Sequence, residues 1–361
     1  MRRWLSIIIT GFLTNSCGYG IVDPVENYEV RQFYNATASN GDFLRLEVNY
    51  TSKHIEYQNL SRAQSSSIDY TISANGSYEL LDKEQLLKSA YEIPDKTLII
   101  ETSDPSLIIA IVQSPIQIAD LANHELNYLQ FNEDNGGIQL GHITIDDNAN
   151  LQINSYFPAG PLLGTPSAFG ISNIPNEILS EKTTMNTIED ALSSSIILFG
   201  DPNGTLIMKT NNSSTIAWPT SDNTTFNTEY AGKYKTYFYT KISQYVDGHE
   251  LGNANIKHVD TEVSTSGHLL ITGENGVLID VDLIPLQSAE NLYDAEALTS
   301  PCAGLFVAQI PGSSAETYVL FMNDIIAFAH FQNISGSNET SIQYHYIYGL
   351  GVRETVLALK Y

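Results

Sequence analysis

Stretches in which apolar and polar residues alternate recur along the whole chain. Three aromatic examples are FLRLEVNY (43–50), ELNYLQF (125–131) and YKTYFYT (234–240). Because successive side chains of a strand point to opposite faces, such alternation predicts strands with one buried and one solvated face. The 21 Tyr and 13 Phe residues also favour strands over helices. The pattern therefore predicts an all-β protein.

A second pattern consists of two apolar runs joined by a turn. It occurs in IETSDPSLIIAIV (100–112), FGDPNGTLIMKT (199–210) and VAQIPGSSAETYVLFM (307–322). Proline has no N–H to donate to a central ladder but suits a turn, so each stretch predicts a hairpin. Turn-forming residues predict further hairpins at 72–80, 145–153 and 263–271.

Short segments with helical spacing separate the two kinds of hairpin. In residues 82–91, Leu86, Leu87 and Ala90 would cover one side of about two helical turns. A short helix is therefore predicted there. Comparable segments are 187–194 and 291–299.

The order of strand, turn, strand, helix and hairpin occurs three times and predicts an internal repeat of roughly a hundred residues with about six strands. Many strands at regular spacing favour a small barrel or sandwich, and a closed barrel has no exposed edge. We therefore predict an all-β fold of two to three consecutive small antiparallel β-barrel or β-sandwich units with short helices. The predicted divisions are a signal peptide at 1–16, a tether at 17–27, β unit 1 at 28–118, β unit 2 at 119–220, and β unit 3 with the C-terminal strands at 221–361.

The third occurrence of this order begins with Gly232-Lys233-Tyr234, which is followed by early hairpins. This arrangement resembles calycin or lipocalin-type β-barrels. The resemblance implies a barrel that could hold a lipid or another small apolar ligand.

The first seventeen residues have two arginines, an apolar run and then small polar residues, which is the layout of a secretory signal. The run is too short to span a bilayer. Its end, Leu13-Thr14-Asn15-Ser16-Cys17, resembles the lipobox of bacterial lipoproteins, although that family prefers Leu where Thr14 stands. The resemblance implies lipid attachment at Cys17 and, with glycine next, anchoring to the outer membrane. An exported protein of the cell envelope is expected, with the periplasmic or surface side left open.

The two cysteines leave a second possibility. Cleavage by the ordinary signal peptidase between Ser16 and Cys17 also fits the small residues there. In that case Cys17 could pair with Cys302 in an oxidising compartment. A sparse pair of this kind excludes a disulfide-stapled scaffold and a cysteine-rich zinc site.

The charge of the chain narrows the range of partners. Its 17 basic and 41 acidic residues give a net charge of −24. A field of that sign repels phosphate backbones, so nucleic acid is not expected as a partner. Charged residues make up only 16% of the chain, so its surface is expected to be polar but largely uncharged.

Catalytic motifs are missing from the sequence. It contains no Gly-x-Ser-x-Gly elbow and no glycine-rich phosphate loop, so no catalytic residue and no cofactor are predicted. His249, His258 and His268 could meet on neighbouring strands, but a metal site is not expected. Aromatic residues that could contact a ligand are Trp218, Tyr237, Tyr239, Tyr344 and Tyr346; the alternative is that alternate members of these runs face the core.

Three functional hypotheses follow. The leading one is a non-enzymatic cell-envelope lipoprotein whose repeated β domains serve binding or structural interaction, with a protein, glycan or apolar ligand left open. The second is a lipid or small apolar ligand carrier with a lipocalin-like barrel. The third is a glycan-active enzyme, which would need two carboxylates converging across one aromatic cleft.

Overall fold

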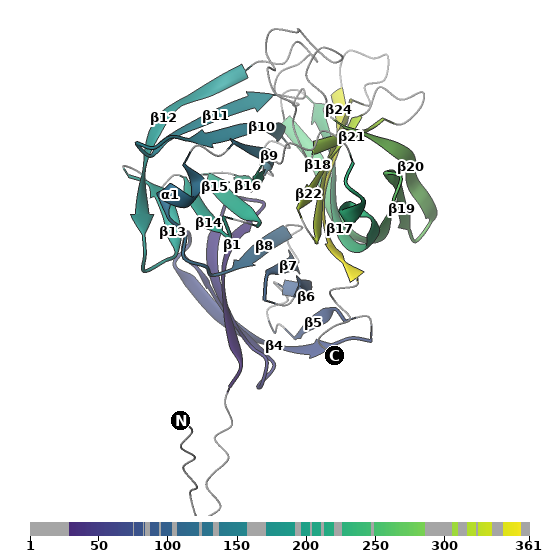
Figure 1. Ribbon diagram of the computed structural model, residues 1–361. Helices are drawn as coiled ribbons and strands as arrows, with labels where there is room; N and C mark the ends of the chain where they lie inside the picture. Colours follow the sequence, from purple (N-terminus) through teal and green to yellow (C-terminus); the bar gives the residue numbers. More distant parts are fainter. Residues whose placement is uncertain are drawn as a thin grey trace, which may run out of the picture.

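The computed structural model contains three closed barrels, each made of eight antiparallel strands in sequence order. Figure 1 shows the purple-blue, teal and green-yellow barrels grouped around a common centre. The sandwich alternative is thereby excluded, and each unit has eight strands rather than about six. The structure describes residues 29–74, 76–81, 83, 87–93, 95–102, 107–122, 125–132, 137–156, 171–191, 196–202, 204–210, 213–219, 226–246, 249–285, 305–309, 316–322, 324–333 and 342–354.

Each strand pairs with the next, and the first strand of each barrel pairs with the last. The strands of barrel 1 are β1 (Arg31–Ala38), β2 (Phe43–Asn49), β3 (His54–Asn59), β4 (Gln64–Ile72), β5 (Tyr78–Leu81), β6 (Leu87–Ile93), β7 (Thr97–Thr102) and β8 (Leu107–Val112). The strands of barrel 2 are β9 (Glu125–Asn132), β10 (Gly137–Ile145), β11 (Asn150–Tyr156), β12 (Ile171–Lys182), β13 (Thr187–Asp190), β14 (Ile197–Gly200), β15 (Leu206–Thr210) and β16 (Ser213–Pro219). The strands of barrel 3 are β17 (Gly232–Val246), β18 (His249–Val263), β19 (His268–Gly273), β20 (Gly276–Pro285), β21 (Leu305–Gln309), β22 (Glu316–Met322), β23 (Ile325–Asn333) and β24 (Ile342–Arg353).

In the described part of the chain, the two helical segments lie between barrels. They are α1 (Ile118–Leu121), between barrels 1 and 2, and the 3-10 turn η2 (Thr228–Tyr230), between barrels 2 and 3. The predicted domain boundaries at 118/119 and 220/221 stay a prediction. The first lies between the strands of barrels 1 and 2, and the second between the strands of barrels 2 and 3.

The helices predicted at 82–91 and 187–194 are wrong, because β6 and β13 occupy those positions. Leu87 and Ala90 do share a face, since both belong to the interior of barrel 1. A register shift between Leu87 and Ser89 places these side chains together without a helical turn. Ladder pairing with neighbouring strands therefore overrides the local spacing. The segment 291–299 lies outside the described residues.

Each barrel interior is filled by one face of its strands. In β7, Leu98 and Ile100 point into barrel 1, while Ile99 between them belongs to a different cluster. Barrels 2 and 3 have equivalent interior clusters, which include Leu198 and Phe321 respectively. The expected alternation of faces is thus present, but both faces of such strands are buried.

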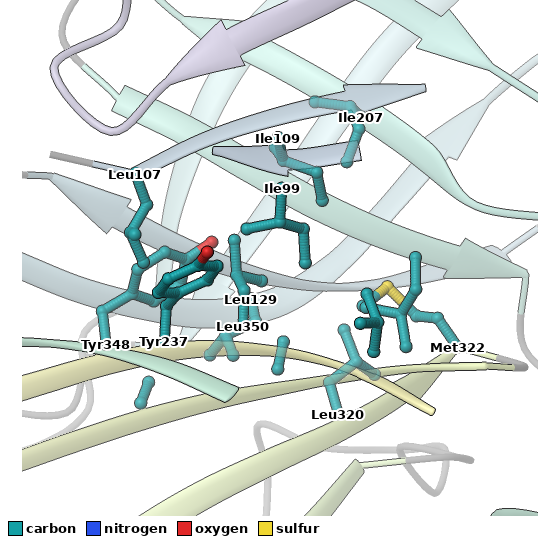
Figure 2. Packing of buried hydrophobic residues seen from close by; sticks show 14 of the residues in the cluster. Ile99, Leu107, Ile109, Leu129, Ile207, Tyr237, Leu320, Met322, Tyr348 and Leu350 are labelled. Atoms are coloured by element: carbon teal, nitrogen blue, oxygen red, sulfur yellow. The ribbon is translucent and has the colours of Figure 1, made fainter. Parts of the chain in front are cut away.

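A fourth cluster lies between the barrels, and we call it the central cluster. It joins outward-facing residues of all three barrels, including Ile109, Ile207 and Leu320, each with an exposed fraction of 1% or less. Figure 2 shows these side chains directed toward one another from separate strands. Its buried members are Phe43, Tyr91, Ile93, Ile99, Leu107, Ile109, Ile111, Leu129, Ile197, Phe199, Ile207, Tyr237, Tyr239, Leu305, Val307, Tyr318, Leu320, Met322, Ile325, Ala327, Ala329, Tyr348, Leu350 and Val352.

The three apolar hairpins in the sequence correspond to the strand pairs β7–β8, β14–β15 and β21–β22. All three pairs contribute to the central cluster, which explains why they share long apolar runs. Their positions in the strand order differ: β7–β8 are the seventh and eighth strands of barrel 1, β14–β15 the sixth and seventh of barrel 2, and β21–β22 the fifth and sixth of barrel 3. The similarity of the hairpins therefore reflects a shared location, not an equal position in the barrel. The internal repeat itself stays a prediction.

Candidate functional site

Two of the predicted aromatic contacts, Tyr237 and Tyr239, are buried in the central cluster at 0% and 1% exposure. Both lie on β17, where Phe238 between them fills the interior of barrel 3. The Tyr237 ring packs 4.7 Å from the Tyr91 ring of barrel 1, and burial raises its pKa well above the usual value. These two side chains are therefore not part of an exposed recognition surface, because barrel 1 covers the outer face of β17.

The other predicted contacts are placed by their strands. Tyr344 and Tyr346 lie on β24, opposite Ser243 and Lys241 of β17. Trp218 lies on β16 of barrel 2, opposite Asn127 of β9. Tyr344 and Tyr346 thus share a strand pair with Tyr237 and Tyr239, whereas Trp218 belongs to another barrel. Their ligand role stays a prediction, and Cys17 lies outside the described residues.

Barrels 1 and 3 also meet through a polar cluster that the sequence did not suggest. The Glu101 carboxylate accepts a hydrogen bond from Ser89 Oγ at 2.9 Å and lies 2.9 Å from His258 Nε2. Ser89 Oγ is in turn 2.9 Å from the Tyr237 hydroxyl. Burial raises the pKa of Glu101, but the hydrogen bonds from His258 and Ser89 outweigh it, and the net pKa is lowered.

This cluster contains the residue types of a hydrolase triad in a different order. Nucleophilic catalysis needs a histidine between the serine and the acid, so that the imidazole can take the hydroxyl proton. Here the carboxylate of Glu101 lies between Ser89 and His258. The arrangement joins two barrels and does not activate a nucleophile. No local signal could have predicted it, since residues 101 and 258 are far apart in the chain.

The interior of barrel 1 holds a buried carboxylate surrounded by tyrosines. Glu92 is 2% exposed and accepts a hydrogen bond from the Tyr34 hydroxyl at 2.7 Å. The hydroxyls of Tyr50 and Tyr78 also donate to Glu92. Burial, followed by the nearby Glu92 charge, raises the pKa values of Tyr34 and Tyr50. These phenols remain protonated and donate to the buried carboxylate inside barrel 1.

One end of barrel 3 is filled by residues that precede its first strand. The Phe226 ring lies 5.8 Å from the Phe306 ring, and the Tyr230 ring stacks on Phe321 at 4.8 Å. The Arg353 guanidinium lies over the Tyr234 ring at 5.5 Å. Phe226 and Tyr230 thus pack into this end of barrel 3, and Arg353 of β24 covers the ring of Tyr234.

An open groove of about 680 Å³ lies on the outer face of β1 to β4 in barrel 1. Because Leu46, Val48 and Ile55 face the interior, the alternate side chains of these strands face the groove. Arg45 contacts Met185 Sδ of barrel 2 at 3.7 Å, which places the β12–β13 turn beside it. The lining residues are Phe33, Arg45, Leu46, Glu47, Glu56, Tyr57, Gln58, Ser65, Ser66, Ser67 and Gln113.

Two of the three histidines that could have met on neighbouring strands, His258 and His268, are engaged separately. His268 lies 2.8 Å from Asp282 and 2.7 Å from Asp280, and these hydrogen bonds raise its pKa. His258 is paired with Glu101. Among the described residues, no three His, Cys, Asp or Glu side chains are grouped to hold a metal ion. In the same residues, no helix has the length and apolar character needed to cross a membrane.

No protein-family model matches the chain, and no curated protein matches it. Among solved structures, it is similar to a mutant of transferrin binding protein B from Haemophilus parasuis, with 11% identity, a TM-score of 0.27, and coverage of 90% of this chain and 76% of that one. The same protein from Neisseria meningitidis has 12% identity and a TM-score of 0.23, with coverage of 87% of this chain and 66% of that one. A Nostoc punctiforme protein of unknown function has 8% identity and a TM-score of 0.18, with coverage of 66% of this chain and 100% of that one. Likenesses at this level assign neither a family nor a ligand to the chain.

Proposed function

We propose that this chain is a non-enzymatic binding protein of the cell envelope, held to the membrane by a lipid on Cys17. Its three barrels serve as a scaffold, and its ligand contacts the outside of that scaffold. The observation that carries the proposal is the contrast between the interiors of barrels 1 and 3, where large aromatic side chains are buried, and the open groove on the outside of β1 to β4.

The aromatic packing inside barrels 1 and 3 argues against the lipid carrier. A carrier barrel needs an apolar cavity large enough to enclose most of its ligand. In barrel 1 that space holds Tyr34, Tyr70 and Tyr78, with Tyr70 stacked on Tyr78 at 4.5 Å. In barrel 3 it holds Phe306 and Phe321, with the aromatic groups before β17 packed against them.

The arrangement of polar groups argues against hydrolysis. The serine, histidine and acid that converge in the described residues do so in an order that cannot activate the serine. The glycan-active enzyme stays the weaker alternative, since it would need two carboxylates acting from opposite sides of a bound sugar. Binding without turnover fits the groove better.

Native mass spectrometry of the mature protein after mild detergent extraction tests the proposal. We expect the mass of the chain with acyl groups on Cys17 and with no further bound lipid. The variant Cys17→Ser should lose the acyl mass. The variant Phe226→Ala should open one end of barrel 3 and bind a fluorescent apolar probe, because apolar cavities accept apolar guests.

A lipid that copurifies with the wild-type protein and is displaced by the probe would contradict the proposal and support the carrier. An unmodified Cys17 joined to Cys302 would contradict the anchor and leave the binding role to be judged by the other measurements.

A further inference from the structure

The outer groove presents two rows of side chains on the outer face of strands β1 to β4. One row follows the paired positions Phe33, Glu47, Glu56 and Ser67; the other follows Arg45, Gln58 and Ser65. Neighbouring strands lie about 4.8 Å apart, so the first row extends for about 14 Å across four strands and the second for about 10 Å across three. The groove is therefore an elongated track that could follow a chain-like ligand.

The charges in this track are nearly balanced. Glu47 pairs with Arg31 at the edge of the groove, and Arg45 lies opposite Gln58, one row from Glu56. A groove with balanced charge does not favour a strongly anionic or cationic ligand. The net charge of −24 of the whole chain further disfavours anions.

Phe33 is the large apolar side chain exposed in the groove, at 45%. The neighbouring outward positions carry carboxylate, guanidinium, amide or hydroxyl groups. One exposed ring among polar groups is too little apolar surface for a lipid or for an apolar peptide anchor. It is suited to a ligand with one apolar face and many hydroxyl groups.

Several polar side chains in the track have no hydrogen bond within the described part of the protein. Together these exposed groups offer donors and acceptors, as hydroxyl ligands require, because the serine hydroxyls and the glutamine amide do both and the carboxylate accepts. They are Glu56, Gln58, Ser65 and Ser67.

We propose that the outer groove binds a neutral oligosaccharide. Phe33 packs against a sugar ring, and the polar side chains of the two rows contact the sugar hydroxyls. This inference rests on the proposed binding function and specifies its ligand class. Carboxylates and amides provide directional hydrogen bonds to hydroxyl groups, and the aromatic face excludes water from the apolar side of the ring.

A glycan array probed with the fluorescently labelled full chain tests this inference. The array should carry neutral glycans, sialylated and uronate-containing glycans, and blank spots. We expect saturable binding to a subset of the neutral glycans and none to the acidic ones. The tightest-binding neutral glycan is then titrated against variants.

Phe33→Ala should weaken that titration about tenfold, which corresponds to about 1.4 kcal/mol of lost contact. Gln58→Ala should weaken it by about threefold. Ile284→Ala is the matched control, because Ile284 is exposed at 53% on barrel 3 and should leave binding unchanged. Thermal unfolding of each variant shows that the fold is retained.

Absence of binding to every neutral glycan overturns the inference, as does neutral-glycan binding that Phe33→Ala leaves unchanged. A purified protein partner whose binding depends on Phe33, with no glycan bound, overturns the sugar assignment but leaves the proposed function standing. A lipid displaced from the barrels in the mass-spectrometric experiment would instead defeat the proposed function itself.

Discussion

Strands β7 and β8 differ from strands β3 and β4 of the same barrel in how their two faces are used. Residues 97–101 and 107–111 are buried without a break. In β4, buried Ile68 and Tyr70 alternate with exposed residues. All four strands contribute one face to the interior of barrel 1. The difference is that the other face of β7 and β8 packs against two further barrels, whereas that of β3 and β4 meets solvent and the outer groove.

The comparison identifies what a continuous apolar run means in this protein. An alternating strand needs one covering layer, while a run such as LIIAIV needs two. The same requirement applies to β14–β15 and β21–β22, which complete the central cluster. The three barrels should therefore behave as one packed unit through these hairpins, and the outer strands should tolerate change.

Removing a central side chain should produce the largest effect. Leu320→Ala deletes a fully buried side chain of the central cluster and should lower the free energy of unfolding by about 2–5 kcal/mol. Ile284→Ala removes an exposed side chain and should change it by no more than about 0.5 kcal/mol. Urea unfolding followed by circular dichroism measures both. Equal effects of the two variants would show that the central cluster is not a packed core.

Overfilling the interior of barrel 3 should produce a smaller loss. A Cβ at Gly349 would lie 2.7 Å from two ring atoms of Phe238 and 3.1 Å from Phe328. Gly349→Ala should therefore destabilise the protein by about 1–3 kcal/mol. The smaller side chain in Phe238→Leu should make the double variant less destabilised than the sum of the two single ones. Simple additivity in urea unfolding would contradict this close contact.

Changing the polar contact between barrels 1 and 3 should have the smallest effect and a defined pH dependence. Glu101→Gln should cost about 1 kcal/mol near neutral pH, because the amide keeps only part of the carboxylate's hydrogen bonding. The folded-state pKa of Glu101 lies below its usual 4.5. Its ionised form therefore adds stability above that value, and the contribution is lost as pH falls through the lower folded-state pKa.

Urea unfolding of the wild type and Glu101→Gln across the acid range measures this loss. The wild type should lose more stability than the variant on acidification. Parallel curves for the two proteins would show that Glu101 is not held as a carboxylate by Ser89 and His258.

Several features of the fold could be predicted from local sequence. Alternation in FLRLEVNY and YKTYFYT predicted strands, and β2 and β17 lie there. The spacing of Leu87 and Ala90 misled the prediction, because a bulge and a helical turn can both bring residues three apart to one face. The unbroken apolar run Leu98-Ile99-Ile100 could have indicated a second covering layer, although not which part of the chain supplies it.

The candidate site was much less accessible to prediction. Tyrosine is a residue type common on recognition surfaces, which is why the sequence predicts Tyr237 and Tyr239 as ligand contacts. Only the packing of barrel 1 against β17 removes them from solvent. The outer groove depends on Phe33, Glu47 and Glu56, whose strands show ordinary alternation. Nothing in such a pattern distinguishes a solvated face from a binding face.

The order of polar and apolar residues was enough to determine that this chain forms antiparallel strands in successive modules, because side-chain direction along a strand is a local property of the backbone. Tertiary structure alone decided which apolar outer faces pack against one another and which remain open. That choice depends on contacts between barrels, and a residue's neighbours in the chain carry no information about the barrel that will cover it.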